Sequence, residues 1–305
     1  MGAAAEIMGD GVWADRFWPA AGAANLILHA RDYAGASGPA RAPVICLHGL
    51  TRNARDFETL APHIAAQGRR VLAVDVRGRG QSAWDSDPSR YVPATYALDV
   101  LALMDQLGIA RAVFVGTSMG GLITMVVGAM RPSAIAAAVI NDVGPELAPE
   151  GVKRIMGFAG QGGPVQTWAD ASAYARRVNV SAFPHYDQAQ WDAFARRLFV
   201  EKDGRPVLDY DAAIAKAFAP PLPPPEGQPA PPAPDLWPLF KALGGRPLLT
   251  IRGGTSDLLS PDILNRMREA VPAMAVAEVP GVGHAPMLDE PEALAAIDAL
   301  LEAAP

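Results

Sequence analysis

Cysteine is almost absent from this chain, since Cys46 is the only one among 305 residues. A single cysteine excludes an internal disulfide and any metal site built from several cysteines. Cys46 lies in the apolar run 44–47, so we expect a small core residue there and not a reactive thiol.

The chain also lacks an excess of positive charge and any long apolar run. Lys and Arg total 26 against 32 Asp and Glu, a formal net charge of −6, so nothing favours a nucleic-acid partner. No stretch approaches the roughly 18 uninterrupted apolar residues that a membrane-spanning helix needs. Residues 1–10 contain neither a basic segment nor a long apolar one. We therefore expect no secretory signal, no membrane partner and a cytoplasmic location.

Short apolar runs alternate with longer helical patterns in a chain that is 50% hydrophobic. Strands are expected at 26–29, 44–47, 71–74, 113–115, 137–140, 248–251 and 275–279, and helices at 56–67, 94–107, 121–130 and 261–271. Nearly continuous apolar strands that alternate with helices are typical of a parallel sheet. The pattern predicts an α/β fold with a mostly parallel sheet covered by helices on both faces.

This alternation stops after residue 144 and resumes at residue 246. The residues between are helical in pattern and rich in aromatic side chains, and they end in a proline-rich tract at 219–234. Prolines at this density disfavour helix and sheet and favour a stiff extended linker, although a peptide-recognition ligand is the alternative. We therefore expect a core of 1–144 and 246–305, with a helical cap at 145–245 and the tract as one of its stalks.

A serine lies between two glycines in the sequence GTSMG at residues 116–120. An apolar run precedes it at 112–115 and another follows at 121–127, so Ser118 is expected on a turn between a buried strand and a buried helix. Such a turn exposes the serine hydroxyl, and the first amides of the helix point at it. The pattern predicts a nucleophile, with an ordinary glycine-rich turn as the alternative.

A serine nucleophile needs a histidine base and a carboxylate that orients the histidine. His284 lies in a glycine-rich loop after the last expected strand and is the predicted base. Asp257 is the predicted acid, because it follows the strand at 248–251 in a short glycine-rich loop at the carboxyl edge of the sheet. Asp142 also ends a strand and is the competing acid, but its loop leads into the cap. The order Ser118, Asp257, His284 matches the order described for this type of elbow.

The loop after the strand at 44–47 begins with His48, Gly49 and Leu50. A tetrahedral oxyanion needs two backbone donors, one from the residue after the nucleophile and one from a loop after an earlier strand. We predict Met119 and Leu50 as these donors, and we expect His48 to hold the loop.

Four side chains are candidate substrate contacts: Arg52, Trp84, Phe158 and His185. For Arg52 a solvated guanidinium is the alternative. The aromatic residues of the cap are expected to line an apolar pocket, but for most of them packing between cap and core is the simpler interpretation.

Taken together, these motifs resemble those of the α/β-hydrolase superfamily. The resemblance rests on His48-Gly49, the sequence DVRGRGQS at 75–82, GTSMG at 116–120, Asp257, and GVGH at 281–284, and it covers about 26–145 and 246–301. It implies an eight-stranded, mainly parallel sheet, a lid over the site and no cofactor, and we expect no metal. The stretch at 75–82 is a landmark of the superfamily that is normally structural.

The identity of the nucleophile narrows the function. Haloalkane dehalogenases and epoxide hydrolases carry aspartate where this chain has Ser118. The sequence therefore favours a serine hydrolase that cleaves a carboxylic ester or lactone of a partly hydrophobic small molecule through an acyl-enzyme. Hydrolysis of a carbon–carbon bond, as in meta-cleavage-product hydrolases, or of a thioester is the alternative among enzymes. A ligand-binding sensor on the same scaffold is the alternative from another class.

Overall fold

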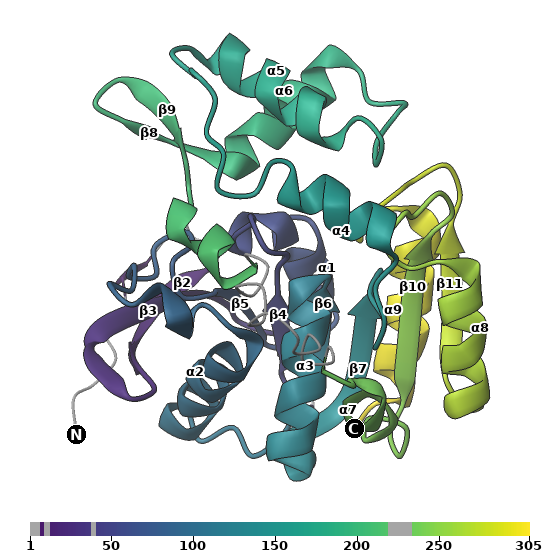
Figure 1. The fold of residues 1–305 in the computed structure, drawn as a ribbon. Helices are drawn as coiled ribbons and strands as arrows, with labels where there is room; N and C mark the ends of the chain where they lie inside the picture. The colour runs from purple at the N-terminus through teal and green to yellow at the C-terminus, as the bar shows by residue number, and fades with distance from the viewer. Residues whose placement is uncertain (1–6, 9–12, 38–40, 219–233) are drawn as a thin grey trace, which may run out of the picture.

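A computed structural model describes residues 7–8, 13–37, 41–218 and 234–305 (Figure 1). Within these residues one sheet has nine strands in the order β1-β2-β3-β5-β4-β6-β7-β10-β11. The strands are β1 (Ile7–Met8), β2 (Ala14–Ala20), β3 (Ala23–Tyr33), β4 (Val44–Leu47), β5 (Val71–Asp75), β6 (Ala112–Thr117), β7 (Ile135–Asn141), β10 (Leu248–Gly253) and β11 (Ala275–Val279). The strands from β5 to β11 pair in parallel, and β1, β2 and β3 are antiparallel to their neighbours. Apart from the two-residue β1, this is the predicted eight-stranded, mainly parallel sheet.

Helices cover both faces of the sheet, as predicted. They are α1 (Leu60–Ala66), α2 (Pro93–Gln106), α3 (Met119–Met130), α8 (Pro261–Ala270) and α9 (Pro291–Ala303). Successive side chains of a strand point to opposite faces, so Val44 and Cys46 pack in the cluster of α1 and α9. Ile45 and Leu47 pack in the cluster of α2, α3 and α8. Cys46 is buried, which confirms its interpretation as a core residue.

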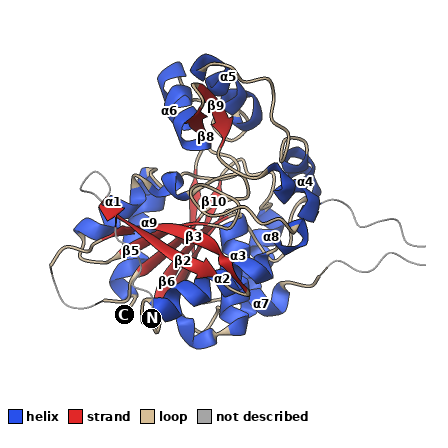
Figure 2. Ribbon diagram, turned by 90° about the vertical axis from the view of Figure 1, so that its left-hand side faces the viewer, coloured by secondary structure: helices blue, strands red, loops and turns tan. Residues whose placement is uncertain are grey.

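A further layer lies over the carboxyl edge of the sheet (Figures 1 and 2). We call it the insertion (residues 149–210); it contains α4 (Pro149–Met156), α5 (Trp168–Asn179), α6 (Gln188–Leu198) and the hairpin of β8 (Phe199–Lys202) and β9 (Arg205–Leu208). Its aromatic residues form a separate core that includes Tyr174, Phe183, Trp191, Phe194 and Phe199. Most of them therefore serve packing, as expected.

The predicted limits of the cap need one correction and leave one part open. Helix α7 (Trp237–Lys241) falls within 145–245, yet its Phe240 packs in the core cluster that contains α3. Trp237 and Leu239 of the same helix also pack against this cluster. Of the proline-rich tract at 219–234, residues 219–233 lie outside the described residues. No helix within the described ranges is long and apolar enough to cross a bilayer.

Candidate active site

Ser118 occupies the turn between β6 and α3. Its backbone has φ 51° and ψ −114°, a strained conformation for a residue with a Cβ. Its amide N–H donates to the carbonyl oxygen of Asn141 at 2.8 Å. A Cβ at Gly116 would collide with the backbone of Gly120, and a Cβ at Gly120 would collide with the carbonyl of Leu47. Both glycines therefore permit the close approach of strand and helix that raises the serine above the sheet.

His284 joins Ser118 to a buried carboxylate. Its Nε2 is 2.9 Å from Oγ of Ser118, and its Nδ1 is 2.8 Å from Oδ2 of Asp142. The amide of Gly253 donates to Oδ1 of Asp142 at 2.8 Å, and the Ser256 hydroxyl donates to Oδ2 at 2.7 Å. Because a carboxylate only accepts, these partners assign the ring proton to Nδ1. The lone pair on Nε2 then faces the serine hydroxyl and can take its proton.

Contrary to the sequence prediction, Asp257 pairs with Arg154 of α4 and not with His284. The two hydrogen bonds measure 2.5 Å and 2.9 Å, and this guanidinium lowers the pKa of Asp257. Asp142 takes the place beside the imidazole because β7 adjoins β6, the strand that leads to Ser118. Asp257 follows β10, one strand farther away, and its loop turns towards α4.

Two supporting residues, Asn141 and Ser256, escaped the sequence analysis. The side-chain amide of Asn141 donates to Oγ1 of Thr117 at 3.0 Å and to the carbonyl of Pro286 at 2.8 Å. It therefore ties the loop of His284 to the ends of β6 and β7. The sequence did offer a signal, because Asn141 and Asp142 are two polar residues directly after an apolar strand.

His48 holds the loop after β4, as expected. It is fully buried, and burial lowers its pKa to about 4. The neutral ring donates from Nδ1 to the carbonyl of Gly49 at 2.7 Å and accepts at Nε2 from the amide of Val76 at 3.0 Å. The Gly49 carbonyl also accepts from the amide of Arg52 at 3.2 Å. Because N–H and C=O of a trans peptide point in opposite directions, the Leu50 N–H faces away from these donors.

Leu50 and Met119 flank the nucleophile. A Cβ at Gly49 would lie 3.8 Å from the Cβ of Ser118, so the peptide that carries the Leu50 N–H adjoins the serine. Met119 is the first residue of α3. Within the described part of the chain, neither amide donates a hydrogen bond to another protein group. Two free N–H groups beside the hydroxyl can hold an oxygen that gains negative charge.

A buried guanidinium supports both of these residues. Arg79 is completely buried; it donates to the carbonyl of Leu50 at 3.0 Å, and its Nη2 is 3.6 Å from Sδ of Met119. Its Nη1 donates to the carbonyl of Arg77 at 2.7 Å and to the hydroxyl of Tyr96 at 2.8 Å. Among the described residues no carboxylate forms an ion pair with it. The guanidinium also lies 5.0 Å from the centre of the Tyr96 ring, so its positive charge is held by hydrogen bonds and an aromatic ring next to the predicted oxyanion donors.

Comparison with known proteins identifies the family. The sequence profile of the alpha/beta hydrolase family matches residues 44–297. The chain belongs to this family. A 3-hydroxybutyrate-oligomer hydrolase from Cupriavidus necator is 35% identical over 275 residues, which cover 88% of this chain and 91% of that protein. An esterase from Mycobacterium tuberculosis is 29% identical over 266 residues, 82% of this chain and 79% of that protein.

A solved structure agrees with this assignment. The crystal structure of an alpha/beta hydrolase from Novosphingobium aromaticivorans has a TM-score of 0.86 at 46% identity, and the match covers 96% of this chain and 99% of that chain. The superfamily resemblance of the motifs is therefore confirmed. In the described parts of this α/β hydrolase, no group of three or more His, Cys, Asp or Glu side chains is placed to hold a metal ion.

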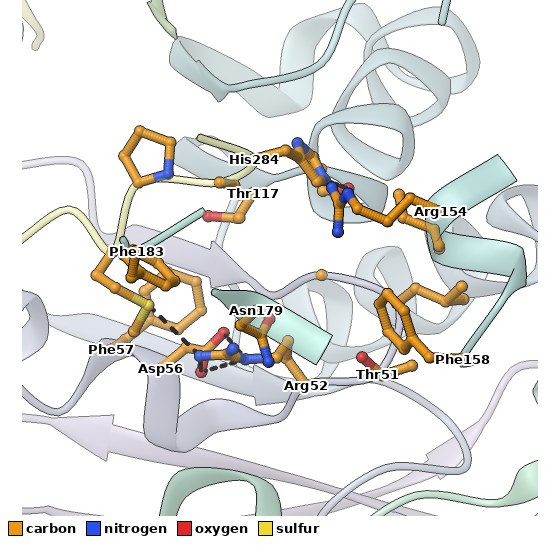
Figure 3. A pocket seen from close by; sticks show the side chains of 17 residues that line it. Thr51, Arg52, Asp56, Phe57, Thr117, Arg154, Phe158, Asn179, Phe183 and His284 are labelled. Atoms are coloured by element: carbon orange, nitrogen blue, oxygen red, sulfur yellow. Dashed lines mark hydrogen bonds and ion pairs between the residues drawn. The ribbon is translucent and has the colours of Figure 1, made fainter. Parts of the chain in front are cut away.

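The site of this α/β hydrolase opens into a small pocket (Figure 3). Its volume is about 70 Å³, and its wall includes Ser118, His284 and residues 49–52. Of the four candidate substrate contacts, Arg52 and Phe158 lie in this wall. Arg52 is ion-paired with Asp56 at 2.6 Å, and its guanidinium lies 4.2 Å from the centre of the Phe194 ring.

The other two candidates, Trp84 and His185, lie outside the pocket wall. Trp84 is 58% exposed. The amide of Ala83 donates to the carbonyl of Ile27 at 2.9 Å, which ties the loop before Trp84 to β3. His185 is exposed on the insertion, with its Nε2 close to Gly281. Neither side chain lines this pocket, and their contact with a substrate stays a prediction.

Proposed function

We propose that this chain is a serine esterase in which Ser118, His284 and Asp142 act together. One observation carries the proposal: a continuous run of hydrogen bonds leads from Oγ of Ser118 through the imidazole to the Asp142 carboxylate, at the wall of a pocket. Asp142 replaces Asp257 as the acid of the proposed triad. The esterase among the relatives of this chain supports the choice of an ester bond.

Acylation uses the serine and the imidazole. Oγ of Ser118 attacks the acyl carbonyl carbon while its proton passes to Nε2 of His284. The carbonyl oxygen becomes negative and is held by the amides of Met119 and Leu50. The carbon–oxygen bond of the ester then breaks, and Nε2 returns the proton to the departing alcohol. Asp142 keeps Nδ1 protonated and stabilises the imidazolium in between.

Deacylation repeats these steps with water. Nε2 of His284 takes a proton from a water molecule, the resulting hydroxide attacks the acyl-enzyme, and Oγ of Ser118 leaves and regains its proton. A lactone would follow the same path, with the alcohol still attached to the acyl group.

The size of the pocket favours a short acyl group. A volume of about 70 Å³ leaves room for only a handful of water-sized groups. The 3-hydroxybutyrate-oligomer hydrolase aligns over most of both chains, so linear oligomers of 3-hydroxybutyrate join the simple short-chain esters as candidate substrates.

Release of p-nitrophenol from p-nitrophenyl butyrate tests the proposal. The wild-type protein is expected to hydrolyse this ester, and Ser118→Ala is expected to lose at least about 10³-fold in kcat. Ser86→Ala, at an exposed position, is the matched control and should keep full activity. Absence of p-nitrophenol release, together with hydrolysis of a 2-hydroxy-6-oxo dienoate, would instead make the chain a carbon–carbon bond hydrolase.

A further inference from the structure

A second cavity adjoins the wall of the catalytic pocket. We call it the outer groove; its volume is about 540 Å³, and it lies between the end of α4, the loop at 157–163 and α5. Arg154 and Phe158 line both cavities, so these two side chains form a shared wall. Figure 3 labels both of them at one end of the catalytic pocket.

A third, narrow space of about 10 Å³ lies where the walls of the two cavities meet. Its wall combines Thr51 and Arg52 of the catalytic pocket with Tyr174 and Val178 of the outer groove, and Phe158 belongs to all three spaces. The Phe158 side chain therefore stands between the catalytic pocket and the outer groove. A chain-like molecule with its reacting bond at the serine would have to pass this ring to leave the catalytic pocket.

Two arginines line the outer groove in a protein with a net charge of −6. Arg154 and Arg177 line it, and no carboxylate-bearing residue is among its described wall residues. Arg154 binds Asp257 through Nε and Nη2; its Nη1 has no partner among the described residues. The Arg177 guanidinium lies 5.0 Å from the centre of the Tyr174 ring, and within the described ranges no carboxylate pairs with it. Free guanidinium N–H groups bind carboxylates well.

We propose that the outer groove binds the distal part of an extended ester whose end carries a carboxylate. This inference rests on the proposed esterase function. The short unit next to the scissile bond occupies the catalytic pocket, the remainder passes Phe158, and the carboxylate meets Arg177 and the free Nη1 of Arg154. A long uncharged alkyl chain fits less well, because it would offer no acceptor to Arg177 or to Nη1 of Arg154.

Free-acid 3-hydroxybutyrate oligomers, dimer to pentamer, and their methyl esters test this proposal directly. Across the free acids, the carboxylate can lie farther from a cleavable ester bond as the chain becomes longer. The methyl esters have the same chain lengths but lack the negative charge. For the wild-type protein we expect kcat/KM to favour the longer free acids over their methyl esters. The preference should shrink as salt is added, because the groove is open to solvent.

Arg177→Gln isolates the charge of the outer groove. It should raise KM for the longer free acids by roughly tenfold, the effect of losing one charge-assisted hydrogen bond, and leave kcat/KM for p-nitrophenyl butyrate unchanged. Arg176→Gln is the matched control, since Arg176 is exposed on the same helix and lies outside the groove wall. Equal losses in the two variants would contradict the proposal.

The outcomes separate this inference from the proposed function. One outcome is that the wild-type protein hydrolyses p-nitrophenyl butyrate and shows equal kcat/KM for the free acids and their methyl esters. That result would overturn the proposed carboxylate site and leave the proposed esterase function standing. A wild-type protein that hydrolyses none of these esters would overturn both.

Discussion

At the scale of single residues, the proposed chemistry depends on the direction of two carboxylates. Asp142 is fully buried and accepts hydrogen bonds from Gly253, Ser256 and His284. Asp257 faces Arg154 instead. Local sequence did not distinguish the two, because each follows a parallel strand and only the strand order decides which one reaches the imidazole.

Asparagine substitutions at these two positions should differ sharply in effect. Asp142→Asn keeps the shape but favours the wrong imidazole tautomer, so kcat for p-nitrophenyl butyrate should fall by roughly 10³- to 10⁴-fold. Asp257→Asn should cost less than about tenfold in kcat, since it breaks only a partly exposed ion pair with Arg154. Thermal melting of both variants controls for loss of fold. A larger loss of kcat for Asp257→Asn than for Asp142→Asn would indicate that Asp257, after β10, is the acid.

Arg79 is a positioning residue by its contacts. Its guanidinium fixes the Leu50 carbonyl and touches Met119, while the substrate meets only the two amides. Arg79→Met should therefore lower kcat with little change in KM, by up to about 10²-fold, the effect of removing one oxyanion donor. Arg79→Lys keeps the positive charge but lacks the planar set of N–H donors of a guanidinium. Its kcat should therefore lie between those of the wild type and Arg79→Met. A rise in KM at constant kcat would contradict this role.

At the scale of elements, His29 connects three strands. Its ring on β3 is 2.7 Å from Oδ2 of Asp75 on β5 and 2.8 Å from Oδ1 of Asp15 on β2. Burial by itself lowers the pKa of His29, but the hydrogen bonds and charges of Asp75 and Asp15 outweigh it and raise the pKa above 6.5. The folded state therefore binds this proton more tightly than the unfolded state.

This raised pKa predicts the pH dependence of stability. The contribution of charged His29 is fully present below about pH 6.5 and is lost as pH rises through the higher pKa of the folded state. The wild type should therefore exceed His29→Gln in free energy of unfolding by urea. This difference should be larger at about pH 5.5 than at about pH 9. A difference that grows with pH would contradict the assignment.

Fully buried strands were predictable, whereas some partly polar ones were missed. The apolar run at 44–47 matches β4 residue for residue, and the run at 71–74 ends one residue before the end of β5. The pattern missed β2, since Asp15 and Arg16 interrupt its apolar residues. Their partners, His29 and Asp32, lie on β3. The β8–β9 hairpin was also missed, although its turn residues Asp203 and Gly204, both with positive φ, form a recognised hairpin signal.

Some residues of the candidate site were likewise predictable from the local sequence, and others were not. Ser118 and His284 could each be predicted from the glycine-rich sequence around them, and the structure brings their side chains together. The partner of His284 depends instead on which strands are neighbours in the sheet, a long-range property that a single sequence does not encode locally. The role of Arg79 is equally non-local, because its contacts join three separate segments.

At the scale of the whole molecule, the insertion meets the core at Gly151 of α4. Its amide donates to the carbonyl of Asp257 at 3.0 Å, and a Cβ there would lie 2.7 Å from the same oxygen. Because α4 also carries Arg154, and Phe158 follows it closely, this contact sets the position of one wall of the catalytic pocket.

Gly151→Ala should disturb this contact. We expect a loss of about 1–3 kcal/mol in the free energy of unfolding, the usual effect of overpacking, together with a lower kcat/KM for p-nitrophenyl butyrate. Gly245→Ala is the matched control, because a Cβ there meets open space, and it should stay within about 0.5 kcal/mol of the wild type. Equal stability and activity for the two variants would show that α4 is not held at this point.

The central claim is that Ser118 is an activated nucleophile, and labelling with a fluorophosphonate followed by peptide mass spectrometry tests it most directly. The hydrogen bond that Ser118 donates to His284 predicts one covalent adduct on the peptide that contains Ser118, and its loss in Ser118→Ala. It also predicts strongly slowed labelling in Asp142→Asn and nearly unchanged labelling in Asp257→Asn. A folded wild-type protein that forms no adduct, or forms it on another serine, would contradict the account.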